Sequence, residues 1–112
     1  MIKNAIVLVP FPFDDFSSLK VRPALCLTEK IGKYEHVIIA FISSKVMGEI
    51  LESDIIIRKN SEEWKDTGLV VDSVIRLHKM VTIPGSLIQR KLGHVNSSLK
   101  AQIREKIQGL FY

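Results

Sequence analysis

Residues 72–83 read DSVIRLHKMVTI, and this stretch sets the pattern for the rest of the chain. Valine, isoleucine and threonine recur through it, and such β-branched side chains favour extended backbone. The Pro84-Gly85 pair that follows favours a turn, since proline fixes φ and glycine tolerates unusual backbone conformations. We therefore predict a long strand within Val70–Ile83 that ends at this turn.

This strand carries two polar side chains among its apolar ones. Because side chains alternate between the two faces of a strand, Arg76 and His78 share one face, about 7 Å apart. Ile75 and Leu77 then occupy the opposite face. A guanidinium can bind a phosphate and an imidazole titrates near neutral pH, so the polar face is suited to a cleft. The simpler interpretation, a solvent-facing strand with two ordinary polar side chains, is favoured by the spacing alone.

Shorter apolar stretches on both sides predict further strands. The run HVIIAFI at residues 36–42 is continuous enough to be buried on both faces. Pro10 and Pro12 restrict the end of the first stretch to a sheet edge or an exit, because proline cannot donate a ladder hydrogen bond. Polar loops occupy residues 14–20 and 60–68. The predicted strands are Ala5–Phe13, Arg22–Thr28, His36–Ile42, Asp54–Arg58, part of Val70–Ile83, and Leu87–Leu92.

The C-terminal segment changes to a helical period. Apolar side chains from Leu99 to Leu110 recur at helical spacing and form one stripe. Asn96 or a serine after it can cap the helix, and Gly109 falls where a helix commonly stops. We predict a helix over Ser97–Leu110. Five to seven short strands and a closing helix predict a small β-barrel or strongly bent sheet with the helix packed on it.

Length and composition limit the class of protein. The 112 residues are enough for one hydrophobic core, and 46% hydrophobic with 25% charged residues is typical of a globular domain. No apolar run approaches the ~20 residues that span a bilayer. Cys26 is the single cysteine and lies in an apolar run, so we expect a buried, inert thiol. We expect one domain over residues 1–112, no membrane association and a cytoplasmic location.

The net charge of +4 is concentrated near the C-terminus. Residues 85–112 hold five basic residues against Glu105 alone. A basic face favours a polyanion such as nucleic acid, although an ordinary solvated helix face has the same composition. None of His36, His78 and His94 lies at a metal-ligand spacing from a carboxylate or a cysteine. We therefore predict no metal site and no cofactor.

Two further positions have side chains suited to an anion. Arg22 lies where the 14–20 loop meets a strand, although a salt bridge to Asp14 or Asp15 would explain it equally well. Ser43 and Ser44 follow the HVIIAFI run, and their hydroxyls either cap a turn or donate to an anion in a cleft. The physical chemistry of these residues suggests an anion site without fixing it.

The order of these segments resembles a known family. The resemblance rests on five segments in order: FPF at residues 11–13 with a polar loop, VRPALCL at 21–27, an apolar strand ending in ISS, DSVIRLHKMVTI and a basic helix. In these segments the chain resembles the MazF/PemK-type toxins of bacterial toxin–antitoxin systems. The resemblance runs nearly from end to end. It implies a mainly β fold with a C-terminal helix, an SH3-like small β-barrel of the CcdB/MazF type. It also implies a homodimer, with single-stranded RNA in a groove at the dimer interface, and a cognate antitoxin whose disordered tail occupies that groove.

The resemblance further implies a metal-independent ribonuclease that cuts mRNA at short sequences and arrests growth. Position by position, Arg22 matches the family's catalytic arginine and Ser43 falls where members commonly carry a threonine. Arg76 and His78 fall where some members place a phosphate-binding arginine and an acid–base residue, although aspartate or another polar residue is usual at position 78. The first loop, DDFSSLK, also departs from the family, because many members have glycine with glutamine or glutamate there.

The chemistry of metal-free RNA cleavage assigns these residues their roles. The ribose 2′-hydroxyl attacks the phosphate, which leaves a 2′,3′-cyclic phosphate and a 5′-hydroxyl. Arginine stays protonated and therefore stabilises charge, whereas an imidazole can act as general base or acid. The expected catalytic residues are Arg22, Ser43 and His78, and the expected RNA-binding residues are Arg76, Lys79, Lys20, Ser18 and Ser44.

A non-catalytic module on the same barrel is the alternative to an enzyme. Such a module would bind nucleic acid or a protein partner, as gyrase-poisoning relatives do, because fold alone does not determine function. An enzyme requires Arg22, Ser43 and His78 to converge in a groove, and a binding module does not. Phe11, Phe13 and Leu110 are apolar, and their exposure would favour a dimer in either case.

Overall fold

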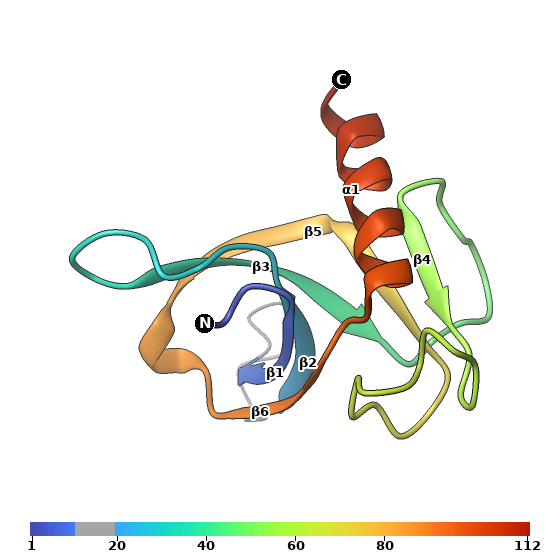
Figure 1. The fold of residues 1–112 in the computed structure, drawn as a ribbon, viewed down its shortest axis with the longest axis horizontal. Helices are drawn as coiled ribbons and strands as arrows, with labels where there is room; N and C mark the ends of the chain where they lie inside the picture. The colour runs from blue at the N-terminus through green and yellow to red at the C-terminus, as the bar shows by residue number, and fades with distance from the viewer. Residues whose placement is uncertain (11–19) are drawn as a thin grey trace.

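The computed structural model describes residues 1–10 and 20–112 and shows a curled sheet with one helix (Figure 1). In the described part of the chain six strands form one sheet in the order β4-β5-β3-β2-β1-β6, and all neighbours are antiparallel. The sheet bends into a half-barrel, which confirms the predicted mainly β class with a C-terminal helix. The elements are β1 (Ala5–Pro10), β2 (Val21–Cys26), β3 (His36–Ser43), β4 (Asp54–Ile57), β5 (Ser73–Pro84), the 3₁₀ turn η1 (Gly85–Leu87), β6 (Arg90–His94) and α1 (Ser97–Phe111).

Both faces of the curled sheet are buried. One apolar cluster lies beneath α1 and includes the fully buried Leu99. A second cluster fills the opposite face. Because strand residues alternate, β3 contributes Ala40 and Ile42 to the first cluster and Ile39 and Phe41 to the second. The prediction that this strand is buried on both faces is therefore confirmed.

The helix starts where the sequence predicts and ends later. The Asn96 side chain accepts a hydrogen bond from the Leu99 N–H at 3.0 Å and caps the first turn. The predicted stop at Gly109 is wrong, because α1 continues to Phe111. The Tyr112 N–H still donates to the Gln108 carbonyl at 2.8 Å. Glycine weakens a helix but ends it only where the backbone turns left-handed, and Gly109 does not.

Several strand boundaries shift from those predicted. The second strand ends at Cys26 rather than Thr28. The last strand begins at Arg90 rather than Leu87, because η1 occupies the residues after the Pro84 turn. The predicted extension of the first strand over residues 11–13 lies outside the described residues. Cys26 is fully buried as predicted, and burial, with a smaller effect of the Glu29 charge, raises the pKa of its thiol to about 11.

The regular alternation predicted for the long strand is interrupted. Ala40 pairs with Met80 but the next residue, Phe41, pairs with Arg76, so residues 77–79 have no partner on β3. This irregularity is a β-bulge, which bends a strand and redirects side chains. Leu77 nevertheless remains in the cluster beneath α1, as predicted.

A close backbone contact joins the segment 66–68 to β6. A Cβ built on Gly93 would lie 2.1 Å from the Asp66 carbonyl oxygen, and one built on Gly68 would lie 2.2 Å from that of Leu92. Gly68 also has a φ of +75°, which favours glycine. The two glycines therefore allow main chain to pack directly on main chain. No helix in the described part of the chain is long and apolar enough to cross a membrane.

Candidate functional site

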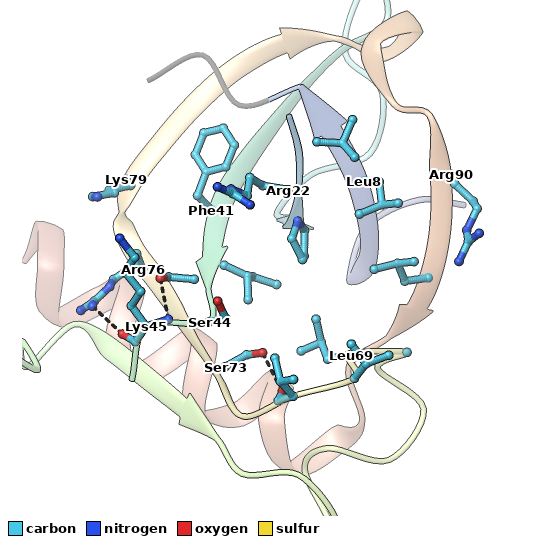
Figure 2. A pocket seen from close by; sticks show the side chains of 18 residues that line it. Leu8, Arg22, Phe41, Ser44, Lys45, Leu69, Ser73, Arg76, Lys79 and Arg90 are labelled. Carbon is cyan, nitrogen blue, oxygen red and sulfur yellow. Dashed lines mark hydrogen bonds between the residues drawn. The ribbon is translucent and has the colours of Figure 1, made fainter. Parts of the chain in front are cut away.

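A groove of about 590 Å³ opens where the end of β3 meets the start of β2 and the segment 68–73 (Figure 2). No carboxylate from the described residues lines it, so the charged side chains on the described part of its wall are all cationic. Exposed Val70 and Val71 add an apolar part to the wall. Five cationic residues from the described part of the chain border the groove, although the side chains of Lys79 and Arg90 point away from its opening (Figure 2): Arg22, Lys45, Arg76, Lys79 and Arg90.

The antiparallel pairing of β2 with β3 brings Arg22 and Ser43 to this groove. Ala24 pairs with Phe41, and the same register continued by two residues sets Arg22 opposite Ser43. Both residues are half-buried and both line the groove. In Figure 2 Arg22 and Phe41 extend from their neighbouring strands into the same side of the opening. Two of the three side chains predicted to be catalytic are therefore brought together.

Ser43 caps a turn and also lines the groove, so both roles considered for its hydroxyl are compatible with its position. Its Oγ accepts a hydrogen bond from the Lys45 N–H at 3.0 Å, which is a turn cap at the end of β3. A serine hydroxyl accepts and donates, so this contact leaves its O–H able to donate toward the groove. The cap fixes the oxygen at the groove wall.

Arg76 lines the groove with a guanidinium that is anchored from behind. Nη1 donates to Oδ2 of Asp54 and, at 3.3 Å, to the Glu49 carbonyl, while Nη2 donates to the Lys45 carbonyl at 3.4 Å. The Arg76 side chain is only 16% exposed and that of Asp54 is fully buried. A guanidinium has five N–H donors, so three of them hold the protein and two remain.

His78 lies beside this pair but does not line the groove. Its Nδ1 is 3.9 Å from Oδ1 of Asp54, and its side chain is 35% exposed. Lys79, from the same bulge, borders the groove instead. The three side chains predicted to be catalytic thus do not all converge: His78 contacts the Asp54–Arg76 pair and is not part of the groove wall.

The other predicted RNA-binding residues divide between wall and surroundings. Ser44 and Lys79 line the groove, whereas Lys20 is exposed and does not. Ser18 lies outside the described residues, as do the two aspartates suggested as salt-bridge partners of Arg22. Among the described residues no group of three or more histidine, cysteine, aspartate or glutamate side chains is arranged to hold a metal ion.

Sequence reasoning missed Asp54, Lys45 and Arg90. Asp54 is a carboxylate at the start of a β-branched strand, and a charge in such a strand signals a buried partner. Lys45 follows the two serines directly, so a basic residue at that strand end was a usable signal. Arg90 joins the groove because β6 packs beside β1, where it pairs with Leu8, and no local pattern indicates this.

The comparisons with known proteins agree with this fold. A family profile described as "PemK-like, MazF-like toxin of type II toxin-antitoxin system" matches residues 3–111. The Mycobacterium tuberculosis toxin MazF-mt6 superposes with a TM-score of 0.72 at 24% identity, over 96% of this chain and 95% of that one. An Mtb toxin gives 0.68 at 22%, over 95% and 99%.

At these identities the two structures show the shared fold, and no curated protein sequence matches the chain. The family profile carries the assignment, because it spans nearly every residue. The chain therefore belongs to the PemK-like, MazF-like toxins of type II toxin–antitoxin systems.

Proposed function

We propose that this toxin is a metal-independent, sequence-specific endoribonuclease that cleaves single-stranded mRNA. The observation that carries the proposal is the groove, in which Arg22 and Ser43 lie on adjacent strands among five cations and no described carboxylate. Such a groove attracts a polyanion and offers donors to a single phosphodiester.

The reaction needs no group beyond those of the RNA and the protein. The 2′-oxygen of a ribose attacks the adjacent phosphorus while the bond to the 5′-oxygen of the next nucleotide breaks. A base takes the 2′-hydroxyl proton and an acid protonates the leaving 5′-oxygen, so the products are a 2′,3′-cyclic phosphate and a 5′-hydroxyl. Arg22 stabilises the negative charge that develops on the phosphorane, and the Ser43 O–H donates to a phosphate oxygen.

Phosphate and base contacts are divided along the groove. Arg76 and Lys79 bind neighbouring phosphates, and Ser44 adds a hydroxyl donor. Lys20, just before β2, and Ser18, outside the described residues, keep their predicted role as further RNA contacts. The exposed Val70 and Val71 offer apolar surface to unstacked bases, which single-stranded RNA presents freely.

His78 is proposed as the general base or acid on its chemistry and its place beside Arg76, although it does not itself line the groove. An imidazole titrates near neutral pH, and each proton-transfer role is typically worth ~10²–10⁴ in rate. Replacement of His78 by alanine should lower the cleavage rate by about this factor. An unchanged rate would assign the proton transfer to another group.

The toxin is proposed to act in the cytoplasm as a homodimer that its antitoxin restrains. Leu110 and Phe111 are exposed on the last turn of α1, and such apolar surface supports contact with a second copy. Phe11 and Phe13, suggested for the same role, lie outside the described residues. The antitoxin partner follows from the family, and its contact with the groove is part of this proposal.

The central test is incubation with single-stranded RNA in EDTA, followed by analysis of the product ends. We expect cyclic phosphate ends, and a rate lower by about 10²–10³-fold in Arg22→Ala, as for removal of one oxyanion donor. Arg104→Ala is the matched control, because Arg104 is exposed on α1 and does not line the groove. RNA that stays intact at high protein excess would support the non-catalytic binding module instead.

A further inference from the structure

Asp54 is the one buried charged residue in the described part of the chain, at 5% exposure. It begins β4 and pairs across the sheet with Arg76 of β5. Burial of a carboxylate is costly unless charge and hydrogen bonds compensate it. Asp54 does not line the groove, so direct contact with a ligand does not explain why a carboxylate is buried here.

The Oδ2 atom of Asp54 organises the loop that connects β3 to β4. It accepts from Nη1 of Arg76 and from the Leu51 N–H at 2.8 Å. The same guanidinium holds the carbonyls of Lys45 and Glu49. The carboxylate of Asp54 and the guanidinium of Arg76 therefore fix residues near both ends of this loop. The first residues of the loop, Ser44 and Lys45, line the groove.

The Oδ1 atom of Asp54 has a different environment. It is buried and has no hydrogen-bond partner among the described residues. Nδ1 of His78 lies 3.9 Å from it. A hydrogen bond requires this separation to shorten by about 1 Å, and the partly exposed imidazole is not enclosed by the core.

We propose that Asp54 is a positioning residue that serves both of its neighbours, fixing Arg76 through Oδ2 and accepting a hydrogen bond from Nδ1 of His78 through Oδ1. A carboxylate accepts only, so this contact selects the imidazole tautomer with its proton on Nδ1. Nε2 then carries no proton and has the form required of a general base. That use of Nε2 rests on the proposed nuclease function, whereas the tautomer does not.

The substitution Asp54→Asn tests the assignment with a nearly isosteric side chain. The amide oxygen has to take the place of Oδ2, because Arg76 and the Leu51 N–H both donate there. The amide nitrogen then faces His78 and donates to Nδ1, so the imidazole proton moves to Nε2. Imidazole ¹⁵N chemical shifts distinguish the two tautomers directly.

We expect the Nδ1–H tautomer in the wild-type protein and the Nε2–H tautomer in Asp54→Asn. Glu35→Gln is the matched control, because it removes one carboxylate charge at the opposite end of β3 from Ser43. It should leave the His78 signals unchanged. An Nε2–H tautomer in the wild-type protein would overturn the proposal, and this result does not require the variant to fold.

Cleavage kinetics provide the second measurement. Asp54→Asn should lower kcat by about 10–100-fold, with a smaller change in KM. This is less than the ~10²–10⁴-fold expected for removal of the proton-transfer group itself, because the imidazole is still present. Wild-type protein that leaves RNA intact would refute the nuclease and not the tautomer. An active wild-type enzyme with the same tautomer and the same kcat in Asp54→Asn would refute the positioning role alone.

Discussion

The cluster beneath α1 and the groove at the end of β3 are built from the same strands but differ in the kind of side chain that they gather. Ile75 is fully buried in the cluster, and the next residue, Arg76, lines the groove. The cluster is apolar throughout, whereas the groove gathers cations without a described carboxylate in its wall. Burial stabilises the first region, and mutual repulsion of cations opposes folding in the second. Stability and ligand binding should therefore respond to different substitutions.

The largest expected effect separates the two regions by stability. Leu99→Ala removes a fully buried side chain from the contact between α1 and the sheet. The free energy of unfolding should fall by about 2–5 kcal/mol, as for other buried leucines. Denaturant unfolding measures this loss, and RNA affinity per folded molecule should not change. A parallel loss of affinity would show that the two regions are coupled.

The next effect concerns the groove alone. Lys79→Ala removes one cation from its wall, so the slope of log affinity against log salt for single-stranded RNA should decrease by about 0.7. Lys33→Ala, in the turn at the opposite end of β3, is the control and should leave the slope unchanged. Thermal stability should change little in either variant. Equal slopes for both variants would place RNA outside the groove.

A smaller effect should increase stability. Gly109 lies inside α1, and a Cβ added there would meet nothing within 4 Å. Gly109→Ala should raise the free energy of unfolding by about 0.5–1 kcal/mol through helix propensity, with no change in RNA affinity. Gly68→Ala is the opposing case, because its Cβ would collide with the Leu92 carbonyl. A destabilised Gly109→Ala would contradict the packing described for the helix end.

The smallest effect belongs to an exposed pair that is part of neither region. A hydrogen bond from the Lys59 N–H, with Arg58 adding to it, lowers the pKa of Asp72 from its ordinary 3.8. The stability that this contributes is present above pH 3.8 and is lost as pH falls through the lowered pKa. Asp72→Asn should therefore reduce the melting temperature slightly at neutral pH, and this difference should vanish in acid. A difference that persists in acid would exclude the carboxylate charge as its source.

Sequence patterns predicted the fold well, because they depend on local alternation and helical spacing. Apolar runs located the strands and the stripe from Leu99 located α1. The bulge at residues 77–79 could not be predicted, since it arises from the register between β3 and β5. The anchoring of Arg76 was also inaccessible, because Asp54 lies 22 residues away in the sequence.

For the site, residue types were more informative than their predicted positions. Arg22 and Ser43 do line one groove, because both stand at strand ends that antiparallel pairing brings together. Arg76 and His78 both lie beside Asp54, as a shared face predicts, but only Arg76 lines the groove. The catalytic role of His78 stays a prediction, which the tautomer and kinetic measurements address.

The main-chain contact between Gly68 and Leu92 restricts how this toxin can diversify. A side chain of any size at Gly68 or Gly93 would collide with backbone, so the width of the groove on that side is set by the fold. Under the proposed nuclease function, exposed wall positions such as Val70, Val71 and Lys45 are the ones free to vary with the target sequence. Libraries that vary these three residues and leave both glycines intact would test whether the groove wall sets a cleavage preference.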